Sequence, residues 1–99
     1  MFQEPWSCIE DYPFQLKLAL ELELKKELIP VHALYEISFE VLAKREDQDD
    51  ILISTESGFY IVHLTWSGRA EAMPFPCFQY HRDLESLNKQ LSIDMELYS

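Results

Sequence analysis

The stretch of residues 35–66, YEISFEVLAKREDQDDILISTESGFYIVHLTW, decides the fold. Apolar and polar residues alternate from Tyr35 to Ala43, and two further apolar runs cover residues 50–55 and 59–66. Alternation of this kind is typical of half-buried β-strands. The link Glu56-Ser57-Gly58 fits a tight hairpin in which Gly58 takes a positive φ. Three successive strands with short links predict an antiparallel meander.

Helices are expected before and after these strands. Leucines alternate along residues 16–24, as in a strand, but the run consists of Leu, Lys, Glu, Ala and Gln, which are strong helix formers. We therefore predict a helix over 13–29, capped by Asp11 and ended by Pro30. Its apolar arc is wide, so it should be sandwiched or cover a partner. Asp83 should cap a second helix over 82–97, where apolar residues recur every three or four positions.

The expected fold is a single α+β domain covering residues 1–99, in the order α-β-β-β-α. A three-stranded antiparallel meander sheet packs against the two helices, most simply with both on one face. We expect an irregular lead-in over 1–12, pinned to the body by Trp6 and Ile9. Residues 69–79, which contain Pro74 and Pro76, should form an extended crossing loop.

Charge and composition restrict the function classes. The 99 residues are 47% hydrophobic and carry a net charge of −10, which disfavours binding to nucleic acid and to anionic membranes and favours a basic protein partner. The N-terminal residues do not resemble a signal peptide and no apolar run could span a membrane, so we expect a cytoplasmic protein. Cys8 and Cys77 lack metal-site spacing and are expected to be reduced thiols, and we expect no cofactor.

The acidic elbow, defined as residues 44–50, is the first candidate site. Its carboxylates are Glu46, Asp47, Asp49 and Asp50, and it lacks the alternating acids and the glycine of a calcium loop. It is either a solvated hairpin loop or a contact for arginines and lysines of a partner. Trp66 is the aromatic residue that we expect to anchor such a contact, and aromatic cover of the core is the alternative.

A second candidate is a polar site that combines His32, Tyr35, His63 and Thr65 with Asp50. Such a cluster could support acid–base chemistry or bind a small molecule. The alternative is that His63 is a buried imidazole bonded to a backbone or carboxylate partner. The spacing matches no metal site, and the chain lacks a glycine-rich phosphate loop, a GxSxG elbow and an HxxxH pair. We therefore assign no catalytic and no metal-binding residue.

Three segments together resemble a group of short bacterial proteins of about 100 residues and unknown function. They are His32-x-Leu34-Tyr35, then Ala43-x-Arg45-x-Asp47-x-Asp49-Asp50-Ile51-Leu52, then Val62-His63-Leu64-Thr65-Trp66-Ser67-Gly68. Ala33 stands where the pattern has proline, and Gln48 where it has cysteine. The resemblance implies a stand-alone cytosolic protein, with immunity and inhibitor proteins among the functions expected for the group, and argues against a redox role.

Our interpretation of the sequence is a small acidic binding protein, not an enzyme, that masks a basic surface of a partner as an immunity or inhibitor protein does. The alternative is a small-molecule-binding or catalytic domain that uses His32, Tyr35, Asp50 and His63. A third reading is a homodimer formed through the first helix.

Overall fold

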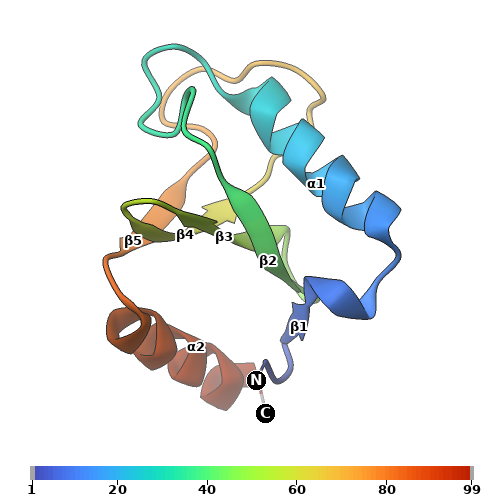
Figure 1. The fold of residues 1–99 in the computed structure, drawn as a ribbon, viewed down its shortest axis with the longest axis vertical. Coiled ribbons are helices and arrows are strands. Elements are labelled where there is room, and N and C mark those ends of the chain that lie inside the picture. Colours follow the sequence, from blue (N-terminus) through green and yellow to red (C-terminus); the bar gives the residue numbers. More distant parts are fainter. Residues whose placement is uncertain (1, 99) are drawn as a thin grey trace.

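The computed structural model describes residues 2–98 and shows an α+β fold in which one antiparallel sheet lies between two helices (Figure 1). Along the sheet the strands follow the order β1-β2-β3-β4-β5. The elements in chain order are β1 (Trp6–Cys8), the 3-10 turn η1 (Ile9–Asp11), α1 (Phe14–Glu27), β2 (Glu40–Arg45), β3 (Asp50–Thr55), β4 (Gly58–His63), β5 (Phe78–His81) and α2 (Leu84–Tyr98).

The central meander of β2, β3 and β4 confirms the three expected strands, although the first begins later than predicted and the third ends at His63, before Trp66. Residues 35–39 are not part of it, because the chain turns there: Tyr35 N–H bonds to His32 O, and Glu36 has a positive φ of 62°. The expected turn at Gly58 is confirmed, with a φ of 141°. A side chain at Gly58 would also collide with the backbone oxygen of His81, so this glycine permits close approach of β5.

The sheet has five strands and not three, because two short strands extend it at its edges. β1 pairs antiparallel with β2, with Trp6 opposite Arg45, and β5 pairs antiparallel with β4, with Phe59 opposite His81. β1 lies in the lead-in that we expected to be irregular, and β5 begins within the expected crossing loop over 69–79. Strands of three and four residues are too short for a sequence period to show.

Both predicted helices are present. The helix-former composition of α1 overrides its alternating leucines, but Asp11 does not cap it: the helix starts after Pro13 without a side-chain cap. In α2 the predicted cap is confirmed, because Asp83 Oδ1 accepts the N–H of Ser86 at 2.9 Å. No helix within residues 2–98 is long and apolar enough to cross a membrane.

The helices pack on opposite faces of the sheet, which corrects the expectation that both share one face (Figure 1). In β3, Ile51 and Ile53 face α1, whereas Leu52 between them faces α2, and all three are buried. A strand that is apolar on both sides needs cover on both faces. Each helix therefore closes a separate core. The α1 core includes Leu20, Leu24, Val62 and Leu64, and the α2 core includes Trp6, Ile61, Leu87 and Leu91.

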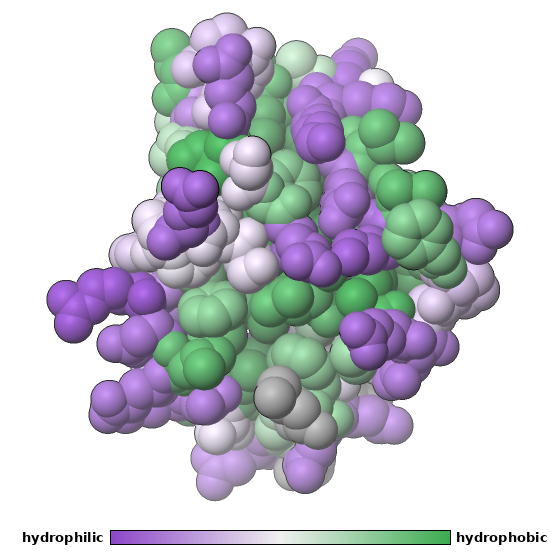
Figure 2. All heavy atoms as spheres, in the orientation of Figure 1, coloured by the Kyte–Doolittle hydropathy of each residue, from purple (hydrophilic) through white to green (hydrophobic). Residues whose placement is uncertain are grey.

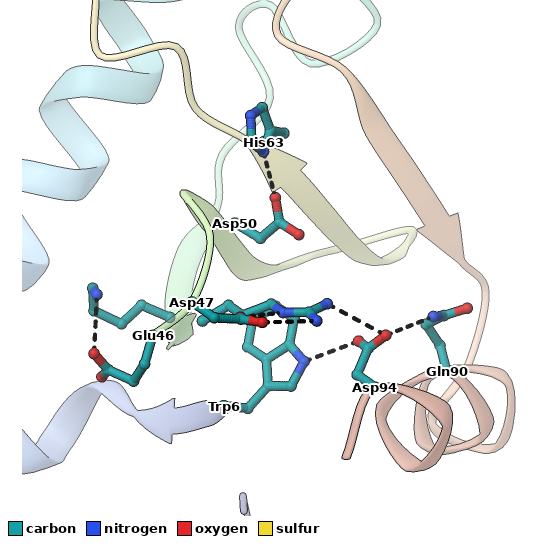
Figure 3. Close-up of polar contacts among 9 residues, drawn as sticks. Trp6, Glu46, Asp47, Asp50, His63, Gln90 and Asp94 are labelled. Atoms are coloured by element: carbon teal, nitrogen blue, oxygen red, sulfur yellow. Dashed lines mark hydrogen bonds and ion pairs between the residues drawn. The ribbon is translucent and has the colours of Figure 1, made fainter. Parts of the chain in front are cut away.

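A buried carboxylate fastens α2 to the sheet (Figure 3). Asp94 is 6% exposed and accepts hydrogen bonds from Trp6 Nε1 and Gln90 Nε2, each at 3.0 Å. The guanidinium of Arg45 lies 3.4 Å from the same carboxylate. Trp6 comes from β1 and Arg45 from β2, so Asp94 joins the lead-in, the sheet and the last helix. The expectation that Trp6 pins the lead-in to the body is thereby confirmed.

We expect Asp94→Ala to lower the free energy of unfolding by about 2–3 kcal/mol, because it leaves the buried Trp6 N–H without an acceptor and Arg45 without this counter-charge. Urea denaturation measures the change. The control is Glu85→Ala on the same helix, which removes only an exposed pair with Lys89 and should cost less than about 0.5 kcal/mol. Equal losses in the two variants would contradict this role of Asp94.

Candidate functional site

The loop that follows β4 is held by two glutamates of α1. Glu27 Oε1 accepts the N–H of Thr65 at 2.9 Å, and its Oε2 accepts the N–H of Trp66 at 3.0 Å. Glu23, one helical turn earlier, accepts the N–H of Gly68 at 3.0 Å. Both glutamates are buried, Glu27 completely. The backbone amides of the loop thus donate hydrogen bonds to carboxylates that would otherwise be buried without a partner.

The two carboxyl groups are also hydrogen-bonded to each other. Burial raises the pKa of Glu27 to about 7, and the same hydrogen bond lowers the pKa of Glu23. Neighbouring carboxyls that cannot both ionise cheaply share a proton. Below pH 7 this proton resides mainly on Glu27, and the lowered pKa of Glu23 favours its charged form.

Trp66 is the residue that this arrangement presents at the surface. Its backbone has a φ of 58°, a left-handed conformation that costs a residue with a side chain about 1 kcal/mol or more. The Glu27 carboxyl holds its amide in place, while 47% of the Trp66 surface stays exposed. A tryptophan used only to cover the core would be more deeply buried.

The acidic elbow lies beside Trp66. Leu64 N–H donates to Asp49 O at 3.0 Å, which joins the end of β4 to the elbow. A small pocket of about 70 Å³ opens there, and Asp49, Asp50 and Trp66 are among its lining residues. The structure therefore brings together three of the five residues that we predicted for partner binding.

The other carboxylates of the elbow are engaged within the chain (Figure 3). Asp47 accepts a forked contact from Arg45, at 2.6 Å from Nε and 3.3 Å from Nη2, and this hydrogen bonding lowers the pKa of Asp47. Glu46 lies 3.5 Å from Lys44 Nζ. Asp50 Oδ1 lies 2.7 Å from Nδ1 of His63. The elbow is thus a turn of mixed charge and not a set of four free carboxylates.

His32 connects two loops. It is buried, its Nδ1 accepts the N–H of Leu34 at 3.0 Å, and its Nε2 consequently carries the hydrogen that it donates to Pro76 O at 2.9 Å. Its ring packs at 5.3 Å from the ring of Phe78. Both ring nitrogens are therefore used within the chain, as in a structural histidine.

The remaining residues of the predicted polar site are dispersed. His63 is exposed, which corrects the reading of a buried imidazole, although its carboxylate partner was expected. Tyr35 lines a pocket of about 410 Å³ with Leu34 and Phe39, whereas Asp50 lines the pocket beside Trp66. Thr65 belongs to the loop that Glu27 holds. Within residues 2–98, no three His, Cys, Asp or Glu side chains are grouped to hold a metal ion.

Glu23 and Glu27 are the site residues that the sequence analysis missed. A signal for them exists in α1, because the pair shares one face of the helix with the buried Leu20 and Leu24. Two acidic residues four positions apart on an apolar helix face indicate that hydrogen-bond donors must lie next to their carboxyl groups. Their partners are backbone amides, which the sequence does not display.

Comparison of the chain with models of known protein families, with curated proteins and with solved structures gives no match.

The raised pKa of Glu27 predicts a pH dependence of stability. Between the ordinary pKa of 4.5 and about 7, the folded chain holds a proton on Glu27 that the unfolded chain releases. The stabilisation is therefore present at low pH and is lost as the pH rises through 7. We expect the Glu27 contribution to the free energy of unfolding to fall by roughly 3 kcal/mol as the pH rises through this interval.

Urea denaturation at a series of pH values, compared with Glu27→Gln, isolates this contribution. Glutamine stays uncharged and keeps one acceptor for the loop, so the difference between wild type and variant should change with pH around 7. The exposed Glu56→Gln should leave the pH profile unchanged. A difference between wild type and Glu27→Gln that is constant from about pH 5 to 9 would contradict the assignment.

Proposed function

We propose that this chain is a small acidic binding protein that masks a basic surface of a partner protein, in the manner of an immunity or inhibitor protein, and has no catalytic activity. The contact surface is Trp66 together with the neighbouring acidic elbow. The observation that carries the proposal is the half-exposed indole of Trp66 on a left-handed backbone, fixed by a buried carboxyl pair.

The arrangement around Trp66 favours binding over a purely structural role. Fixing the loop costs backbone strain at Trp66 and the burial of two carboxyl groups, Glu23 and Glu27. Strain of this kind is concentrated at functional sites. A rigidly held tryptophan loses little conformational freedom when a partner covers it, and tryptophan is enriched among residues that dominate binding energy.

Charge supports a basic partner in two ways. The net charge of −10 attracts a basic surface at long range. At short range, Asp49 is exposed at the pocket beside Trp66, whereas Asp47 already binds Arg45 with both oxygens. We therefore assign the closest charge contact to Asp49. Glu46, Asp47 and Asp50 contribute to the field and to the shape of the elbow.

The alternative of a small-molecule or catalytic site on His32, Tyr35, Asp50 and His63 has less support. His32 uses both ring nitrogens inside the chain, and Tyr35 and Asp50 line different pockets. A small-molecule or catalytic site requires several free polar groups that point to one place, and these residues do not provide such a set.

The test begins with the full chain as bait in host extract, with Asp49→Lys, Trp66→Ala and Leu97→Ala run in parallel. Leu97 is 79% exposed on α2 and provides a matched loss of exposed apolar surface. We expect wild type and Leu97→Ala to capture a basic protein. The amount captured should be lower with Asp49→Lys and with Trp66→Ala. Capture that is equal for all four proteins would refute the assigned surface.

Association kinetics with the captured protein, produced in purified form, then separate the two contributions. Asp49→Lys should slow association, most strongly at low salt, because steering is electrostatic. Trp66→Ala should accelerate dissociation by about 10- to 100-fold and leave association nearly unchanged. Binding that depends neither on salt nor on Trp66 would show that the acidic charge serves solubility alone.

A further inference from the structure

The outward side of α1 carries an exposed apolar stripe. Phe14, Leu18 and Leu22 recur every four residues and are 65%, 43% and 56% exposed. They lie on the side of the helix away from the buried Leu20 and Leu24, so the sheet does not use them. Apolar surface follows the outer side of α1 in Figure 2, with polar side chains around it. Exposed apolar surface that forms a continuous stripe marks an interaction site.

Charges flank this stripe with opposite signs at its two ends. Glu10 and Asp11 are exposed just before the helix, and Lys25 and Lys26 are exposed in its last turn. Leu18 is the midpoint, seven positions from both Asp11 and Lys25. The surface is therefore self-complementary. When a second copy of the helix is rotated by 180° about an axis through Leu18, leucine faces phenylalanine and lysine faces carboxylate.

We propose that the protein forms a symmetric dimer in which α1 packs antiparallel against α1 of a second copy. Leu18 meets Leu18 across the two-fold axis, and Phe14 meets Leu22 of the second copy. Lys25 and Lys26 then approach Glu10 and Asp11 of the second copy. This interface is separate from the Trp66 surface and does not rest on the function proposed for it.

A second copy explains the surface better than a basic partner does. On α1, Lys17, Lys25 and Lys26 balance three glutamates, so the helix has no formal net charge in a molecule of net charge −10. A basic partner would be repelled at the lysine end. In the antiparallel pair, both ends are matched, and the repulsion between two chains of net charge −10 is relieved where they touch.

The expected interface is small. A helix of 14 residues is about 21 Å long, and one pair of such helices buries less area than most permanent dimers do. Additional apolar surface lies at the Phe14 end, where a pocket of about 510 Å³ is lined by Ile9, Tyr12 and Val41 among others. The C-terminal end of the second α1 would cover this pocket. We therefore expect a dimer that dissociates in the micromolar range.

Sedimentation equilibrium across the micromolar range tests the stoichiometry. Wild type should pass from monomer to dimer, and Leu18→Glu, which places two carboxylates at the two-fold axis, should weaken the dimer by about 100-fold. Leu97→Glu is the matched control at an exposed leucine of α2 and should dimerise as wild type does. A wild type that stays monomeric, or a dimer that Leu18→Glu does not weaken, would overturn the proposal.

Charge reversal tests the antiparallel arrangement. The double variant Lys25→Glu/Lys26→Glu should raise the dimer dissociation constant by about tenfold, and so should Glu10→Lys/Asp11→Lys. Combining all four changes restores opposite charges at both ends and should restore the affinity. Failure of the combined variant to recover affinity would refute the arrangement.

Disulfide trapping gives a direct geometric test in a Cys8→Ser/Cys77→Ser background, which removes both native thiols. Antiparallel helices in contact bring residues on the two-fold axis within disulfide reach. Leu18→Cys should therefore form a cross-linked dimer on mild oxidation, and Leu97→Cys should cross-link far more slowly. Equal rates at the two positions would contradict the proposed axis.

Discussion

The loop that carries Trp66 depends on the buried carboxyl pair of α1. Glu27 must find donors inside the protein, and the amides of Thr65 and Trp66 are the donors that the chain supplies. The backbone carbonyl of Glu27 accepts a further hydrogen bond from Glu71 N–H. The segment that follows the loop is therefore also attached to the C-terminal end of α1. The left-handed backbone at Trp66 and the exposure of its indole both follow from this constraint, because the loop must aim its amides at the helix.

On each face of the sheet, a buried carboxyl group is stabilised by hydrogen bonds, but the bonding partners differ. On the α1 face, Glu27 is satisfied by backbone amides and by a shared proton, whereas on the α2 face Asp94 is satisfied by Trp6, Gln90 and Arg45. Each carboxyl group joins segments that are far apart in the sequence. Buried acids in so small a domain therefore fix which segments lie together, while the apolar cores supply most of the stability.

Much of the fold could be predicted from the sequence because the long elements carry a period or a composition signal. The apolar runs of β3 and β4, the helix formers of α1 and the Asp83 cap of α2 are local features. β1 and β5 could not be predicted, since strands of three and four residues exist only through pairing with β2 and β4. The candidate site shows the same division: Asp49, Asp50 and Trp66 were selected from their residue types, whereas the partners of Glu27 could not be predicted, because they are backbone amides 38 and 39 positions away.

The most direct test of this account is an NMR titration of the loop amides against pH. Because Thr65 and Trp66 donate to a carboxyl group with a pKa of about 7, their amide proton shifts should move together with a midpoint near that pH. In Glu27→Gln the same transition should disappear, while Leu16, whose amide bonds to the backbone oxygen of Pro13, serves as the internal reference in both proteins. Thr65 and Trp66 amides that do not titrate in the wild-type protein, or that titrate unchanged in Glu27→Gln, would contradict the central claim that the buried Glu27 carboxyl holds Trp66 in place.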